Sequence, residues 1–279
     1  MLRVVIALAG AAILSAAPNL AVERMALHQF EDGPVLPASY EFLPGEAAHF
    51  SCRLSGFQLD KSDEDDQRVK LAWSVEVHDP AGILLEKPKS GRIEGRVTAE
   101  DKNWLPKFLV EFPIPPFAAS GDYRVTLEAK DEVGSSAVHG ELIFHVRGHD
   151  APASETLTAR NFSFFRSEED AAPLHDAVYH PGEMLFARFD IVGYKFGPNN
   201  RFSVDYGLTV LGADGKRLFT QPEAAADSHE SFYPQRYVPG ALSLSLDKNV
   251  PAGSYTLLVT VRDKLGDQTW EERQQFQVQ

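Results

Sequence analysis

The sequence predicts an all-β protein built from two tandem antiparallel Greek-key β-sandwiches of about seven strands each. The first observation is an internal repeat, because the stretch Gly121–Asp131 recurs at Gly253–Asp263, 132 positions later, with the Gly, the Tyr and the closing Asp in the same places. The second is that apolar residues follow each Tyr at every second position, the period of a strand with one buried face and one wet face. The third is that no segment keeps helical periodicity over the length that a helix needs.

The first element, residues 1–22, reads as an export signal. Arg3 supplies a positive charge, Val4–Leu14 is apolar and uncharged, and the small residues Ser15–Ala17 offer a cleavage zone. Pro18 disfavours a cut directly after them, which moves the expected cut toward Ala21. A retained membrane anchor is the alternative, but the apolar run is too short to span a bilayer comfortably. We expect an extracytoplasmic protein, periplasmic or secreted, without membrane insertion after signal cleavage.

The repeat continues on both sides of the Tyr-led stretch and sets the module boundaries. A Pro-Gly-Glu turn at residues 44–46 recurs at 181–183, an offset of 137 rather than 132, so the length differences lie in loops. We place the first module at residues 23–148 and the second at residues 155–279, with a short linker containing Gly and Pro between them. The spacing of turn residues fits a Greek-key sandwich in each module. In the second module the predicted strands are Leu157–Phe165, Met184–Val192, Arg201–Leu211, Lys216–Phe219, Ala241–Leu246, Ser254–Arg262 and Thr269–Val278.

Two sets of aromatic residues carry a resemblance to a known fold. The Gly-x-Tyr start of the repeated stretch, with Tyr123 and Tyr255, resembles the tyrosine corner, and Trp73 with Tyr206 resembles the central aromatic of strand C. Each module therefore resembles an immunoglobulin-like or macroglobulin-like domain of the bacterial extracytoplasmic kind. Apolar residues stand where antibody domains have their cysteines. The resemblance implies a fold and no single activity.

Composition narrows the classes of partner. The net charge of −13 argues against nucleic acid and against adsorption to an anionic lipid surface. The only cysteine is Cys52, so no intramolecular disulfide forms and each sandwich depends on its core. We expect no cofactor.

Calcium is the one metal for which the sequence offers a candidate. Five carboxylates lie within seven residues and supply the oxygen ligands that Ca²⁺ takes, but the spacing is not that of an EF-hand loop. The favoured interpretation is a solvated loop tip. A zinc site at His175 and His180 lacks a third ligand. The calcium candidates are Asp60, Asp63, Glu64, Asp65 and Asp66.

Two repeated aspartates, Asp131 and Asp263, end the matched strands, and each is followed by a hairpin. We expect each side chain to cap its own turn through backbone N–H groups rather than to bind a ligand.

Catalytic motifs are missing from the sequence. There is no Gly-x-Ser-x-Gly elbow, no His-Glu-x-x-His and no Gly-rich phosphate loop. We therefore expect a protein that is not an enzyme and has no catalytic residues.

An excursion from Thr220 to Pro239 holds aromatic residues outside the repeat pattern. Flat rings beside amides and charges suit sugar stacking or a protein hot spot, and the alternative is that the rings cover the end of the sandwich. We favour that alternative for Tyr237 and for Trp104, which lies in the equivalent region of the first module. We expect Phe232 and Tyr233 to be exposed. The ligand or partner candidates are Phe232, Tyr233 and Arg236.

These observations favour an exported, non-catalytic binding or structural module that acts in protein–protein or cell-envelope interactions. The expected partner is a protein or glycan of the cell envelope, recognised by loops or by a sheet edge. A carbohydrate-binding module of a polysaccharide-processing system is the alternative, and a proteinase inhibitor is a third.

Overall fold

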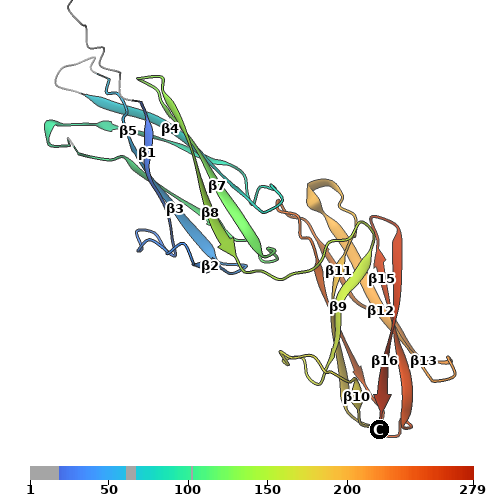
Figure 1. Ribbon diagram of the computed structural model, residues 1–279. Coiled ribbons are helices and arrows are strands. Elements are labelled where there is room, and N and C mark those ends of the chain that lie inside the picture. The colour runs from blue at the N-terminus through green and yellow to red at the C-terminus, as the bar shows by residue number, and fades with distance from the viewer. Residues whose placement is uncertain (1–18, 61–66, 102) are drawn as a thin grey trace, which may run out of the picture.

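The molecule consists of two β-sandwich modules that lie end to end (Figure 1). A computed structural model describes residues 19–60, 67–101 and 103–279. Module 1 comprises strands β1–β8 and module 2 comprises β9–β16. Within the described residues, each module has seven strands of at least seven residues and one strand of two residues. The predicted all-β class and the tandem sandwich architecture are confirmed.

The strands of module 1 begin with β1, whose first two residues pair with β3 although they fall within the predicted signal. No helix among the described residues is long and apolar enough to cross a membrane. The bounds in module 1 are β1 (Ala21–His28), β2 (Glu41–Phe42), β3 (Ala47–Ser55), β4 (Arg68–His78), β5 (Lys89–Arg96), β6 (Lys107–Pro113), β7 (Gly121–Asp131) and β8 (Ala137–Val146).

The strands of module 2 follow in the same order. The 3₁₀ turns stand at different places, because η2 (Pro198–Asn200) precedes β12 in module 2, whereas η1 (Ala99–Asp101) precedes β6 in module 1. The bounds in module 2 are β9 (Thr158–Phe165), β10 (Val178–Tyr179), β11 (Met184–Val192), β12 (Phe202–Leu211), β13 (Arg217–His229), β14 (Val238–Ser245), β15 (Gly253–Asp263) and β16 (Gln268–Val278).

The sheet topology is the same in both modules. Module 1 packs a three-stranded sheet, β1-β3-β6, against a five-stranded sheet, β2-β8-β7-β4-β5. Module 2 has β9-β11-β14 and β10-β16-β15-β12-β13. The two-residue strands β2 and β10 pair in parallel with the last strand of their module, and the longer strands pair antiparallel. The chain crosses between sheets from β3 to β4, from β5 to β6 and from β6 to β7, which is Greek-key connectivity.

The tyrosine corner forms in both modules. Tyr123 Oη donates to the carbonyl of Ala119 at 3.0 Å, and Tyr255 Oη donates to the carbonyl of Pro251 at 2.7 Å. Each ring is buried, and its hydroxyl fixes the chain that leads into the penultimate strand. The repeated Tyr therefore has the same structural role twice, as the pattern predicts.

The repeated aspartates cap turns, and this prediction is also confirmed. Asp263 is buried, and its carboxylate accepts the backbone N–H groups of Leu265 and Gly266 at 3.0 Å each and that of Lys195 at 2.8 Å. Asp131 binds its own turn and the β3–β4 loop in the same way. Each aspartate thus joins two loops at one end of its module.

The prediction for β13 was wrong in its length. β13 runs from Arg217 to His229, so it covers the predicted strand Lys216–Phe219 except its first residue and also the first half of the predicted excursion Thr220–Pro239. Its register with β12 shifts beside Pro222, which leaves the ladder at a bulge because proline has no N–H to donate. Gly207 of β12 lies opposite, where a Cβ would be 2.2 Å from the carbonyl oxygen of Pro222. Pro222 therefore sits inside a strand, at a bulge.

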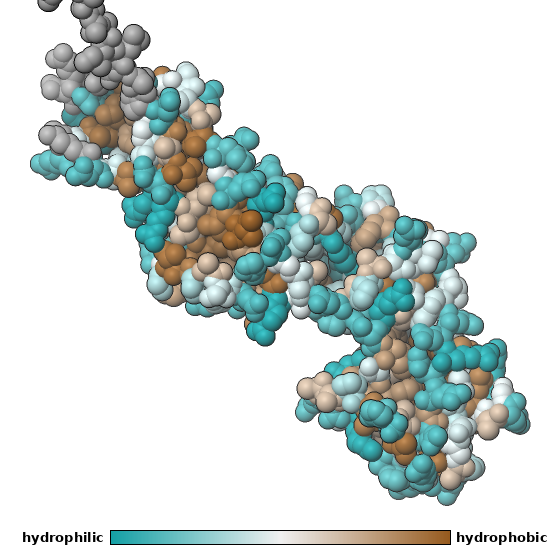
Figure 2. All heavy atoms as spheres, in the orientation of Figure 1, coloured by the Kyte–Doolittle hydropathy of each residue, from teal (hydrophilic) through white to brown (hydrophobic). Residues whose placement is uncertain are grey.

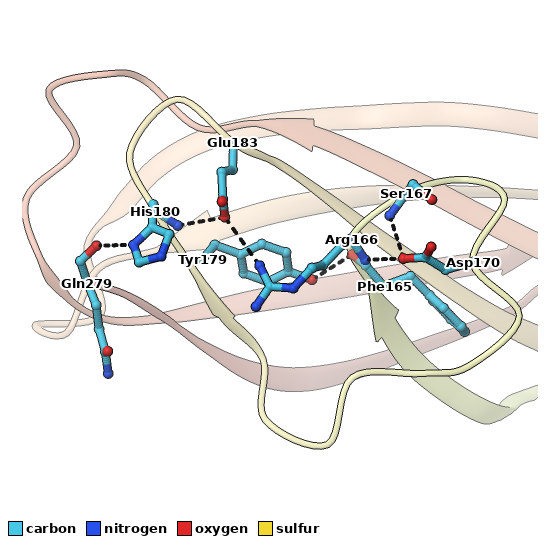
Figure 3. A network of polar contacts seen from close by, with 8 residues as sticks. All are labelled: Phe165, Arg166, Ser167, Asp170, Tyr179, His180, Glu183 and Gln279. Atoms are coloured by element: carbon cyan, nitrogen blue, oxygen red, sulfur yellow. Dashed lines mark hydrogen bonds and ion pairs between the residues drawn. The ribbon is translucent and has the colours of Figure 1, made fainter.

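The end of module 2 farthest from module 1 is closed by a polar network (Figure 3). Glu183 Oε2 accepts the backbone N–H of His180 at 2.8 Å, and Glu46 does the same for Leu43 in module 1, so the repeated Pro-Gly-Glu turn is capped identically. Tyr179 Oη donates to the carbonyl of Phe165 at 3.0 Å and ties β10 to the end of β9. The network anchors the β9–β10 loop.

Candidate binding site at the joint between the modules

A loop of module 2, residues 230–237 between β13 and β14, reaches module 1; it is called the joint loop below. Its own module holds it in shape. Asn200, whose left-handed backbone (φ 54°) asparagine tolerates, donates through Nδ2 to the carbonyl of Phe232 at 2.6 Å. The hydroxyl of Tyr194 donates to the carbonyl of Gln235. The joint loop is therefore presented to module 1 in a defined conformation.

Asp79 of module 1 receives the joint loop. It stands in the β4–β5 turn, its side chain is only 1% exposed, and Oδ1 accepts the backbone N–H groups of Ala81 and Ile83 at 2.8 Å each. Oδ2 accepts Tyr233 Oη at 3.0 Å and also contacts the guanidinium of Arg236. A buried carboxylate is costly unless it is paired and hydrogen-bonded, and here both modules contribute its partners. Asp79, Tyr233 and Arg236 are called the clasp.

Tyr233 enters the core of module 1. Its side chain is 8% exposed and packs with the buried apolar residues of module 1, although it belongs to module 2. Burial raises the pKa of Tyr233 far above its usual range, so the hydroxyl stays protonated and donates to Asp79. Burial also raises the pKa of the neighbouring corner residue Tyr123. The clasp is thus continuous with the tyrosine corner of module 1.

Aromatic contacts extend the joint on a second side. The ring of Tyr237 lies edge-on to Phe117 of module 1, with centroids 5.6 Å apart, and 4.9 Å from the ring of His149 in the linker. His149 Nε2 is 2.7 Å from Asp190 Oδ2 of β11. These contacts anchor the linker to module 2. Tyr237 therefore covers the end of the sandwich, which is the alternative that we favoured for it from the sequence.

A pocket of about 310 Å³ lies beside the clasp; it is called the joint pocket. Module 1 contributes the β6–β7 loop, and module 2 contributes alternate residues from the end of β13 through the joint loop, because the period of two continues past the strand. Figure 2 shows that the surface around the joint is mostly hydrophilic on the face in view. The pocket is lined by Pro115, Pro116, Phe117, Asp227, His229, Ser231, Tyr233 and Gln235.

Three lining residues, Asp227, His229 and Ser231, are the types that form hydrolase triads. Ser231 Oγ donates to the carbonyl of Tyr233 at 2.6 Å. In the part of the chain that the structure describes, no hydrogen bond joins His229 to Asp227 or to Ser231. An activated nucleophile needs a base within hydrogen-bond reach, and this arrangement does not provide one.

The three ligand candidates from the sequence all lie on the joint loop, with different surroundings. Phe232 is 48% exposed, as expected. The expectation that Tyr233 is exposed was wrong, because its ring fills the end of module 1. Arg236 is partly exposed and is held by Asp79.

The other candidates are not brought together. Asp60 Oδ2 lies 2.7 Å from Lys70 Nζ, and the remaining calcium candidates, Asp63, Glu64, Asp65 and Asp66, lie outside the described residues. His175 is close to Asp176, whereas His180 contacts the carbonyl of Gln279. Trp104 is exposed and packs edge-on against Phe57. Over residues 19–60, 67–101 and 103–279, no group of three or more His, Cys, Asp or Glu side chains could hold a metal ion.

Asp79 is the functional residue that sequence reasoning missed. Its sequence context, Asp-Pro-Ala-Gly, indicates only a turn. Its partner Arg236 is 157 positions away, and no periodicity links the two. The only signal in the sequence was that the charged Arg236 lies next to the aromatic Tyr237 in the predicted excursion.

Neither protein-family patterns nor the sequences of curated proteins match this chain. Among solved structures, the C-terminal domain of the antigen I/II-family protein AspA of Streptococcus pyogenes is similar at a TM-score of 0.32 and 9% identity, over 94% of this chain and 99% of that one. The C-terminal domain of the AgI/II polypeptide BspA of Streptococcus agalactiae gives 0.29 and 8%, over 91% and 99%. The C-terminal domain of wzt gives 0.31 and 12%, over 48% and 76%. Similarity at this level carries no information about function.

Proposed function

We propose that this chain is an exported, non-catalytic binding protein of the cell envelope or extracellular space, whose two immunoglobulin-like modules are held at one fixed angle. The clasp is the observation that carries this proposal. A carboxylate of module 1 takes its hydrogen bonds from its own turn and from two side chains of module 2. The modules therefore present one continuous surface to a partner rather than two surfaces that move independently.

The energetics of the clasp support a docked arrangement. Burying the Tyr233 ring contributes about 2 kcal/mol, and its hydrogen bond to the Asp79 carboxylate contributes about 1.5 kcal/mol. The partly exposed Arg236 adds less, because solvent screens its charge. The short linker keeps the entropy cost of docking small. After a small entropy cost is subtracted from these contributions, about 3 kcal/mol would favour the docked state by more than 100-fold.

Phe232 is the proposed contact point for a partner. It is exposed, and Asn200 holds the backbone beside it, so the ring is presented without much loss of entropy on binding. Tyr233 and Arg236 stay in the proposed site as the residues that fix the loop. A single rigid ring also suits sugar stacking, which keeps the glycan-binding alternative. Loss of retention on a polysaccharide column by Phe232→Ala, with retention by the parent chain, would favour that alternative.

The fixed angle is tested by distance measurements between spin labels. Lys130→Cys in module 1 and Gln275→Cys in module 2 place labels on exposed strand positions, and the native thiol of Cys52 is buried. We expect one narrow distance distribution, broadened by Tyr233→Ala or Arg236→Ala. Phe232→Ala, in the same loop, should leave the distribution narrow. A broad distribution in the parent chain would contradict the proposal.

The non-catalytic part of the proposal has its own test. Ester, peptide and glycoside substrates should show no turnover above that of a heat-denatured sample. Turnover that disappears in Ser231→Ala or His229→Ala would instead assign a reaction to the joint pocket.

A further inference from the structure

The joint pocket offers more hydrogen-bond acceptors than donors. Gln235 is buried and donates through Nε2 to the carbonyl of Tyr237 at 2.9 Å, so its amide oxygen Oε1 is the atom available to accept a hydrogen bond from a ligand. The hydroxyl of Ser231 donates its proton to the carbonyl of Tyr233, so its oxygen can act toward a ligand only as an acceptor. The carboxylate of Asp227, an exposed residue near the end of β13, forms no ion pair or hydrogen bond with the residues that the structure describes. His229, which is also exposed and lines the pocket, adds one imidazole N–H donor, so acceptors still outnumber donors. A ligand for these three groups must bring N–H or O–H donors.

The opposite wall of the pocket is apolar and comes from module 1. Pro115, Pro116 and the half-buried Phe117 line it, and Tyr233 of module 2 also lines the pocket. A flat cation can stack on such a wall, because the face of an aromatic ring is negative. The tyrosine hydroxyl is already donated to Asp79 and does not compete for the ligand.

One common group combines these properties. A guanidinium is planar and always charged, carries five N–H donors and stacks on aromatic faces. It would pair with the Asp227 carboxylate, donate to Gln235 Oε1 and lie against Phe117. The volume of about 310 Å³ accommodates this group. Pockets at domain boundaries are common ligand sites, and this one exists only while the modules are docked.

We propose that the joint pocket binds a guanidinium group, either the side chain of an arginine in a partner polypeptide or a free guanidino compound. This proposal rests on the binding role proposed above and names the ligand chemistry. Because the pocket takes residues from both modules, binding would also stabilise the fixed angle through mass action.

The test is titration of the full chain with N-acetyl-arginine amide, followed by calorimetry. N-acetyl-citrulline amide is the matched neutral probe, since it keeps the shape and loses the charge. We expect saturable binding of the arginine probe, and we expect the citrulline probe to bind at least about tenfold more weakly. Free arginine distinguishes the sources, because it binds equally well only if a free compound is accommodated.

Variants locate the site. Asp227→Asn should weaken binding of the arginine probe about tenfold, whereas Glu169→Gln, which removes an exposed carboxylate from the β9–β10 loop, should not change it. Should Asp227→Asn disturb module 2, Phe117→Leu examines the pocket from module 1 and should weaken binding about threefold or more. Equal binding of the two blocked probes, or full affinity in both pocket variants, would overturn the proposal. In that case a narrow spin-label distance distribution in the chain labelled at Lys130→Cys and Gln275→Cys would show that the fixed angle holds although the guanidinium proposal fails.

Discussion

Substitution of Tyr233 in module 2 should lower the stability of module 1. Its ring is buried among the core residues of module 1, and its hydroxyl donates to Asp79 at 3.0 Å. Tyr233→Phe removes the hydrogen bond and keeps the ring, so we expect a loss of about 1.5 kcal/mol. Tyr233→Ala removes both and should cost about 3 kcal/mol, at the low end for deleting a buried aromatic side chain because the site is at the end of a module.

Cys52 provides the assay. It is the only cysteine in the chain, it is fully buried in the core of module 1, and burial raises the pKa of its thiol to about 12. The thiol therefore reacts with a disulfide reagent only when module 1 opens. Labelling rates measured over a series of urea concentrations give the free energy of that opening.

The matched control for this experiment is Phe232→Ala, one position earlier in the joint loop and exposed. It should change the opening free energy by less than about 0.5 kcal/mol. If both Tyr233 variants label at the parental rate, the ring does not stabilise module 1 and the reasoning fails. If Phe232→Ala labels as fast as Tyr233→Ala, the effect belongs to the loop as a whole and not to the clasp.

Three further predictions concern module 2. Asp263→Ala leaves buried backbone N–H groups without an acceptor and should cost about 4 kcal/mol. The cost is read from Trp270 fluorescence in urea after Trp73 and Trp104 of module 1 are replaced by Phe, and a cost below about 1 kcal/mol would refute the capping role. Gly207→Ala places a methyl 2.2 Å from a carbonyl oxygen of β13 and should cost about 3 kcal/mol. Gly197→Ala in the same module, where the added methyl would lie 3.4 Å from Leu265 Cδ1 and the backbone φ is −86°, should be close to neutral, and equal urea midpoints for the two variants would contradict this packing. Burial raises the pKa of Tyr179 to about 12 from about 10 in the unfolded chain, so the buried protonated hydroxyl stabilises the fold fully below pH 10, and this stabilisation is lost as the pH rises toward 12. The thermal midpoint should therefore fall between pH 10 and pH 12, and it should fall less in Tyr179→Phe. Equal falls in the parent chain and in the variant would contradict this prediction.

The features that could be predicted from the sequence are those that depend on neighbouring residues and occur in both modules. Tyr123 and Tyr255 bond to a carbonyl four positions before them, and Asp263 caps a turn that starts beside it, so local pattern and repetition suffice. The alternation of apolar residues fixes which face of each strand is buried, whatever the partner strand is. The all-β class and the sandwich topology follow from these local rules.

The features that sequence reasoning missed depend on distant residues. Pro222 lacks the N–H that a strand ladder needs, but Gly207 on the neighbouring strand leaves room for a bulge and β13 continues. Tyr233 looks like a surface ring because the hollow that it fills belongs to the other module. Asp79 looks like a turn residue because Arg236 is far away in sequence. Tertiary contacts decide these cases, and local sequence patterns do not specify which distant residues meet.

The most direct measurement of the central claim is residual dipolar coupling in a weakly aligned sample of the full chain. Couplings are collected from strand amides of both modules, for example from β7 and β15. A clasp formed by Asp79, Tyr233 and Arg236 predicts that one alignment tensor fits both modules. Tensors that differ in magnitude between the modules would show independent motion and would contradict the account.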